Sequence, residues 1–133
     1  MSAVTDLQQA VVAHLSADPA LADLTGVYDG PPPRAAFPYA AIGDGLVSDW
    51  STKTEQGREI RLAVTLWDDG EAPARLHRLT GSVEAAMVTL PRTLADGRII
   101  SLIFLRTLIA RDAAGPWAGL VEHRIRILQD QEI

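Results

Sequence analysis

The stretch Asp49–Trp67, DWSTKTEQGREIRLAVTLW, carries the pattern that decides the fold. In its second half, four apolar residues alternate with polar or small ones: Ile60, Leu62, Val64 and Leu66. Successive side chains of an extended strand leave opposite faces of a sheet, so this alternation predicts a strand with one buried face. The first half is polar and has no helical period. We therefore expect an exposed loop, from about Ser48 to Gly57, that leads into the strand.

Two amphipathic helices are expected to cover the buried face of this strand. The first spans about Ser2 to Ser16 and has apolar residues three and four positions apart: Val4, Leu7, Val11 and Leu15. The second spans about Ala72 to Leu90 and has a similar stripe: Leu76, Leu79, Val83, Met87 and Leu90. Gly81 lies inside the second helix, where glycine costs about 1 kcal/mol relative to alanine. A close approach of the helix to the sheet would account for this glycine.

Further strands are expected on either side of the second helix. One spans about Pro38 to Val47, and Gly43 and Gly45 would allow a bulge in it. Another spans about Arg98 to Ala110 and is apolar on both faces, which favours either a central position or an outer face against another subunit. The last strand again alternates, with Val121, His123, Ile125 and Ile127 on one side. We expect a single α+β domain over residues 1–133. It would have two layers: a mostly antiparallel sheet of about four to five strands, and two main helices on one face.

Composition limits the classes of protein to which the chain could belong. The 133 residues have a net charge of −5 and a pI near 5.0, which opposes strong non-specific binding to DNA phosphates. There is no cysteine, so disulfides and thiolate metal sites are excluded. We expect no signal peptide and no membrane segment, and hence a soluble intracellular protein.

The residue types that perform catalysis do not form a recognisable pattern. His14, His77 and His123 lie on three different predicted elements, outside any zinc-binding spacing. Asp68 and Asp69 precede a glycine at a strand end, which is typical of a turn. We therefore expect no catalytic residue, cofactor or metal. A small enzyme or nucleotide-binding module remains the alternative of another class.

Tryptophan and arginine outside the predicted core indicate contacts with other proteins. Trp50 begins the polar loop, Trp67 lies on the outer side of the strand that contains Ile60 to Leu66, and Trp117 follows a turn. Tryptophan is enriched in the residues that dominate binding energy at interfaces, although each could instead fold back over the edge of the sheet. Arginines of three predicted strands are expected on the same outer face as Trp67: Arg61, Arg106, Arg124 and Arg126.

Several segments together resemble the tail terminator (tail completion) family of long-tailed bacteriophages and gene transfer agents. They are Phe37–Gly43 (FPYAAIG), Asp49–Glu59 (DWSTKTEQGRE) with the strand to Trp67, Leu15–Leu21 (LSADPAL), the turn Asp96–Arg98 and the closing strand pair. The Trp-Ser-x-Lys-Thr-x-x-Gly loop before an alternating strand is the most specific of these.

This resemblance implies a structural virion protein at the head–tail junction, assembled in the bacterial host cytoplasm. It would form a homo-oligomer, a hexameric ring that caps the tail tube protein and contacts the head-to-tail connector, while DNA passes through the lumen without specific binding. A head-closure or neck adaptor protein of the same particle is the alternative. Nine residues are the expected interface set: Trp50, Thr52, Lys53, Glu55, Gly57, Arg61, Trp67, Arg124 and Arg126.

Overall fold

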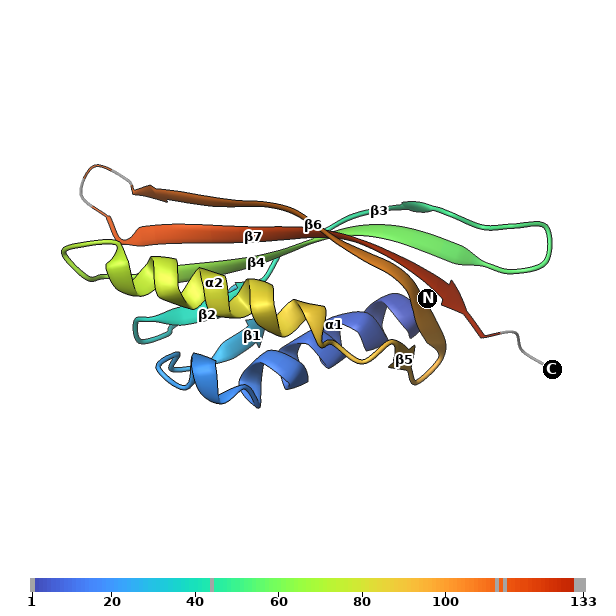
Figure 1. Ribbon diagram of the computed structural model, residues 1–133, viewed down its shortest axis with the longest axis horizontal. Coiled ribbons are helices and arrows are strands. Elements are labelled where there is room, and N and C mark those ends of the chain that lie inside the picture. Colours follow the sequence, from blue (N-terminus) through green and yellow to red (C-terminus); the bar gives the residue numbers. More distant parts are fainter. Residues whose placement is uncertain (1, 44, 112, 114, 131–133) are drawn as a thin grey trace.

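The structure is a computed structural model that describes residues 2–43, 45–111, 113 and 115–130; in this part of the chain a seven-stranded sheet accompanies two long helices (Figure 1). The elements follow the chain as α1 (Ser2–Ser16), a short 3-10 helix η1 (Pro19–Leu21), β1 (Val27–Asp29), β2 (Tyr39–Ile42), β3 (Leu46–Asp49), β4 (Gly57–Asp68), α2 (Ala74–Val88), β5 (Thr93–Leu94), β6 (Gly97–Arg111) and β7 (Trp117–Gln129).

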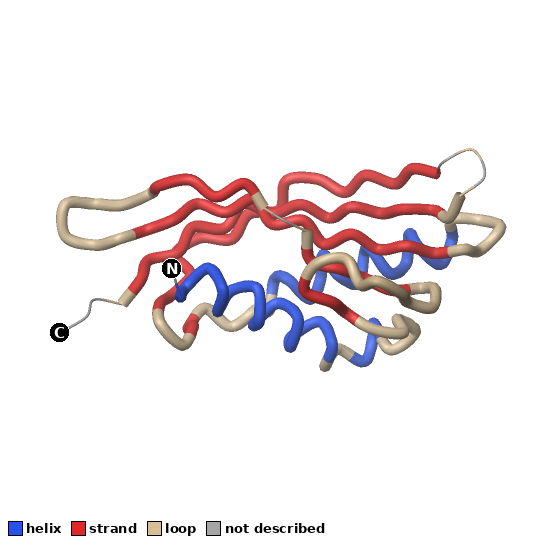
Figure 2. The backbone as a smooth tube through the Cα atoms, turned by 180° about the vertical axis from the view of Figure 1, so that it is seen from behind, coloured by secondary structure: helices blue, strands red, loops and turns tan. Residues whose placement is uncertain are grey.

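The expected two-layer domain with four to five strands is wrong. The sheet has the order β1-β2-β4-β7-β6-β5, β3 also pairs with β4, and β1 pairs with β2 in parallel, so the sheet is mixed. The long strands β4, β6 and β7 have 12, 15 and 13 residues. Strands of this length accumulate twist, and Figures 1 and 2 show the sheet curling like a half-barrel around the helices. The sheet is therefore not a flat layer packed beside a separate layer of helices.

The strand expected over Pro38–Val47 is divided into β2 and β3, which lie one after the other along the same edge of β4. Ile42 is opposite Val64 and Leu46 is opposite Arg61. The bulge that Gly43 and Gly45 would allow includes position 44, which lies outside the described residues. A Cβ on Gly45 would lie 2.3 Å from the Arg61 carbonyl oxygen, so only glycine fits the backbone there.

The core confirms the apolar patterns read from the sequence. In β4, Ile60, Leu62, Val64 and Leu66 are at most 3% exposed. The alternating residues of β7 and both helical stripes join them in a continuous buried cluster: Val121, Ile125, Ile127, Leu7, Val11, Leu15, Leu76, Leu79, Val83 and Met87. Burial of this apolar area is the main force that closes the sheet over the helices.

One expectation about a particular position is wrong, and one of the two alternatives left open for a strand is excluded. Gly81 is exposed, and a Cβ added to it would meet no atom within 4 Å, so no close approach to the sheet requires it. The apolar segment Arg98–Ala110 is a strand, but it is not central. It lies near the edge of the sheet, because its outer neighbour β5 pairs only with Gly97 and Arg98. Neither described helix has the length and apolar character needed to span a bilayer.

Candidate subunit interface

The most exposed part of the fold is a hairpin, which we call the arm, formed by β3, the first five residues of β4 and the loop between them (residues 46–61). All four residues of β3 are exposed, from Leu46 to Asp49. Figure 1 shows the arm extending past the end of α1, where no helix covers it. A strand exposed on both faces has little reason to be apolar in a free subunit, yet β3 begins with Leu46 and Val47.

The loop of the arm is held by its own polar residues. The Thr52 hydroxyl accepts hydrogen bonds from the backbone N–H groups of Thr54 (3.3 Å) and Glu55 (3.0 Å). The Ser51 hydroxyl donates to the Asp49 carboxylate (2.6 Å) and accepts from the Gly57 N–H (3.0 Å). These side-chain-to-backbone bonds are typical of Ser and Thr turns. The polar composition that predicts a loop therefore also fixes its shape.

Side chains at the base of the arm connect the loop to the outer face of the sheet. The Arg126 guanidinium lies 5.3 Å from the centre of the Trp50 ring, which is cation–π geometry. The Arg126 Nε donates to Glu59 Oε1 at 2.9 Å, and the Arg124 Nε lies 3.9 Å from the same oxygen. Arg61 is directly opposite Arg124 and has no ion-pair partner among the described residues. Arg124 and Arg126 thus share the Glu59 carboxylate.

Gly57 closes the arm at its base, where a side chain has no room. A Cβ there would lie 2.4 Å from the Trp50 carbonyl oxygen and 2.9 Å from Leu128 Cδ2. The loop is also tied to the far strand, because Glu55 accepts a hydrogen bond from Arg98 of β6 at 2.9 Å. Lys53 is exposed in the loop and forms no ion pair within the described chain.

Trp67 lies apart from the rest of the expected set. It is six residues beyond Arg61 on β4, which corresponds to about 20 Å along a strand. Its ring stacks on Tyr39, with centroids 5.0 Å apart. Tyr39 also contacts Phe37 (5.6 Å) and Tyr28 (6.2 Å). The structure therefore brings together eight of the nine expected residues in and beside the arm, and it places Trp67 in an aromatic cluster that the sequence did not reveal.

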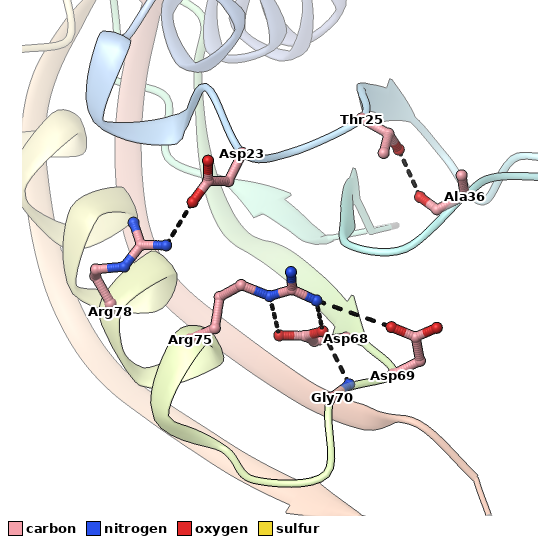
Figure 3. A network of polar contacts seen from close by, with 8 residues as sticks. All are labelled: Asp23, Thr25, Ala36, Asp68, Asp69, Gly70, Arg75 and Arg78. Atoms are coloured by element: carbon pink, nitrogen blue, oxygen red, sulfur yellow. Dashed lines mark hydrogen bonds and ion pairs between the residues drawn. The ribbon is translucent and has the colours of Figure 1, made fainter.

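The strongest polar contacts lie elsewhere and hold α2 to the sheet (Figure 3). Asp68, only 1% exposed, accepts two hydrogen bonds from Arg75 (Nε–Oδ2 2.9 Å) and one from the Gly70 N–H (3.1 Å). The Arg75 guanidinium thereby keeps the pKa of Asp68 below its usual range, against the opposing effect of burial. Arg75 also approaches Asp69 at 3.8 Å. Here the carboxylates are occupied in a turn and an ion pair, as the turn pattern predicts, and Arg75 is the partner that sequence reasoning missed.

His123 is the other titratable group that is buried among the residues described. Burial lowers its pKa, and its Nδ1 has no hydrogen-bond partner within that part of the chain. It packs edge-on against Phe104, with ring centroids 5.6 Å apart. Within residues 2–43, 45–111, 113 and 115–130, no three His, Asp or Glu side chains converge in a way that would bind a metal ion.

A family model described as Tail completion protein gp17 matches residues 9–128 of the chain. The chain belongs to the tail completion protein family. The family resemblance read from the sequence is therefore confirmed. Members of this family are structural proteins of phage-type particles, and a structural tail completion protein is the class to which this chain belongs.

Two solved structures are similar to the chain over most of its length. One is a chain of the virion of a native gene transfer agent, with a TM-score of 0.86 and 30% identity over 96% of this chain and 98% of that one. The other is the gp17 protein of bacteriophage SPP1, with a TM-score of 0.60 and 21% identity over 94% and 91% of the two chains; at this identity the likeness concerns the fold alone. No curated protein sequence matches the chain.

Proposed function

We propose that this tail completion protein is the tail terminator of its particle. Six copies form a ring on the head-proximal end of the tail tube. The ring stops growth of the tube, presents its other face to the head-to-tail connector, and leaves a lumen through which DNA passes. The observation that carries the proposal is the similarity, at 30% identity and over nearly the full length of both chains, to a chain of a gene transfer agent virion.

The surface of the subunit supports this assembly role. A closed ring uses two different patches on each subunit, because every copy contacts one neighbour with each side. We assign one patch to the loop from Trp50 to Gly57, together with Arg124 and Arg126 beneath it, and the other to the outer sheet face around Arg61 and Trp67. The net charge of −5 disfavours tight binding of DNA, so DNA would slide through the lumen without being held.

Particles made without the protein distinguish a terminator from a neck adaptor. If the protein is the terminator, tails assembled without it exceed the normal length and do not join heads. If it is a head-closure or neck adaptor, tails without it have normal length and only the joining fails. Negative-stain electron microscopy of complemented and uncomplemented lysates measures both properties. Tails of normal length in the absence of the protein, or a label on the subunit found away from the head–tail junction, would contradict the proposal.

Removing the indole side chain of Trp50 tests the contribution of the loop to assembly. In a complemented lysate, Trp50→Ala is expected to reduce the number of joined particles at least tenfold, because the alanine has no aromatic face for a neighbouring subunit or for Arg126. Trp50→Phe is the matched control, since it keeps a ring over which Arg126 can stack. Unchanged tail length and unchanged head joining in Trp50→Ala particles would remove the loop from the assembly surface.

A further inference from the structure

Besides the outer edges of the short terminal strands β1 and β5, which have three and two residues, β3 and most of β6 each have one edge without a partner strand in the described chain. On one side, β6 pairs with β5 only at Gly97 and Arg98, and the Ile99 N–H donates to the Arg92 carbonyl oxygen at 2.7 Å, so from Ile100 to Arg111 its outer edge has no partner strand in the described chain. On the other side, β3 pairs with β4 along one edge, and its second edge has no partner among the described strands. Each open edge offers a row of backbone N–H and C=O groups that can pair with another strand.

The exposed apolar residues gather on these two strands. Of the eight large hydrophobic side chains that are exposed in the described residues, six belong to β3 or β6: Leu46, Val47, Ile100, Ile103, Phe104 and Leu108. Leu46 is 71% exposed and Leu108 is 56% exposed. Soluble proteins usually protect open edges with lysine, proline or a very short strand. β3 has only four residues and β6 has two register shifts, but neither strand contains lysine or proline, and β6 has 15 residues.

One segment of β6 is regular enough to receive a strand. The strand has register shifts between Ile99 and Ser101 and between Phe104 and Arg106, but from Arg106 to Arg111 its pairing with β7 is continuous. A regular strand edge of this length can accept the four residues of β3. Within the subunit, Arg106 of this segment is paired with Glu122 at 3.3 Å and Asp49 of β3 with Arg58 at 3.2 Å, so the charges of both strands are already balanced and the pairing would depend on backbone groups and apolar side chains.

We propose that β3 of one copy pairs with the open edge of β6, over Arg106–Arg111, in the neighbouring copy, so that the sheet continues from subunit to subunit. A second copy is the occupant that accounts for both edges at once, because each copy provides one edge of each kind and a foreign strand would cover only one. Such pairing uses backbone hydrogen bonds for affinity and alternate side chains for specificity. The inference rests on the proposed ring and adds a backbone contact between neighbouring copies to the two side-chain patches assigned above.

A charge placed on the edge tests the pairing. Leu108→Lys is expected to prevent ring formation, because lysine in the middle of the segment opposes strand addition. Val88→Lys is the matched control, since Val88 is 69% exposed on α2 and belongs to neither edge. Native mass spectrometry measures the oligomer, and circular dichroism establishes that both variants fold. Ring formation by Leu108→Lys, or its loss in the folded Val88→Lys variant as well, would overturn the inference.

Cross-linking identifies the partner strand. The chain has no cysteine, so Leu46→Cys and Leu108→Cys can be made separately, mixed, and treated with a short bis-maleimide. Leu46 is opposite Arg61 and Leu108 is opposite Leu120, and side chains that are directly opposite on paired strands lie on the same face of the sheet. Both leucine side chains therefore lie on the outer face. We expect a covalent dimer only when the two proteins are mixed. A dimer from Leu108→Cys alone would show symmetric β6 pairing and overturn the inference.

The same reagents separate this inference from the proposed function. If rings form at the head–tail junction and no product joins Leu46→Cys to Leu108→Cys, the strand pairing is wrong and the terminator function stands. If the product forms while particles made without the protein have tails of normal length, the pairing stands and the terminator function is wrong. Cross-linking of Leu108→Cys to the tube or connector protein instead of to a second copy would also overturn the pairing.

Discussion

Gly57→Ala is expected to destabilise the folded chain by about 3 kcal/mol, at the upper end of the range for forcing extra atoms into a packed site. The added Cβ would lie 2.4 Å from the Trp50 carbonyl oxygen and 3.1 Å from the Ile127 carbonyl oxygen. Both contacts are with backbone, so neither can be relieved by rotating a side chain. Urea unfolding followed by tryptophan fluorescence measures the change. The base of the arm must open to admit the methyl group, so head joining should fail as well.

Gly81→Ala is the matched control, because it makes the same chemical change at a glycine with nothing within 4 Å of the added Cβ. In an exposed helix interior, alanine is favoured over glycine by about 1 kcal/mol. The two substitutions should therefore change the free energy of unfolding in opposite directions. A Gly57→Ala variant as stable as the wild type would show that the arm does not need the close approach of Trp50 and β7.

Asp68→Asn is expected to destabilise the chain by about 2 kcal/mol near neutral pH, the usual size of a hydrogen bond to a charged group. The amide cannot accept both guanidinium bonds, and Arg75 then loses the carboxylate that holds α2 to the end of β4. Asp69→Asn is the control, since Asp69 is 63% exposed and only approaches Arg75 at 3.8 Å. A loss of stability in Asp69→Asn equal to that in Asp68→Asn would contradict the assignment.

The effect of Asp68→Asn should depend on pH in a defined direction. The folded chain lowers the pKa of Asp68 below the ordinary value of 3.8. A carboxyl group with a lowered folded pKa stabilises the native state above its unfolded pKa, and it loses that contribution as the pH falls through the folded pKa. The difference in stability between wild type and variant should therefore be constant above about pH 5 and shrink in more acidic solution. A difference that grows on acidification would contradict the lowered pKa.

Periodicity predicts the elements well because it reports directly on burial. The alternation of Ile60, Leu62, Val64 and Leu66 requires a strand with one solvent-exposed face. The stripe from Leu76 to Met87 requires a helix with one buried side. The predicted first helix agrees with α1, and the predicted second helix differs from α2 only at its ends. These patterns lie within short segments of the chain, so they can be recognised in a single sequence.

The architecture was less predictable, because it depends on pairing between distant segments. The two-residue strand β5 carries no periodic signal, and its existence depends on a partner elsewhere in the chain. The apolar run of Arg98–Ala110 is equally compatible with a central strand and with an edge that meets another molecule. Only the strand order decides between them, and it places β6 beside the two-residue strand β5.

The candidate interface divides in the same way. The loop residues Trp50, Thr52 and Gly57 follow from composition, because Ser, Thr and Gly between an exposed strand and a buried one are typical of a turn. The pairing of β4 with β7 then brings Arg126 against Trp50 and sets Arg124 opposite Arg61. The stack of Trp67 on Tyr39 depends on the register of β2 with β4, which nothing in the local sequence specifies.

The sequence by itself determined which faces of the strands and helices are buried, where the helices and long strands lie, and the family to which the chain belongs. Each of these is encoded in local patterns of residue type. The tertiary structure alone decided the number and order of the strands, the curl of the sheet, the buried pair of Asp68 with Arg75, and the exposure of β3 and β6. Those features depend on long-range pairing, in which the free energy of a contact is shared by residues far apart in the chain.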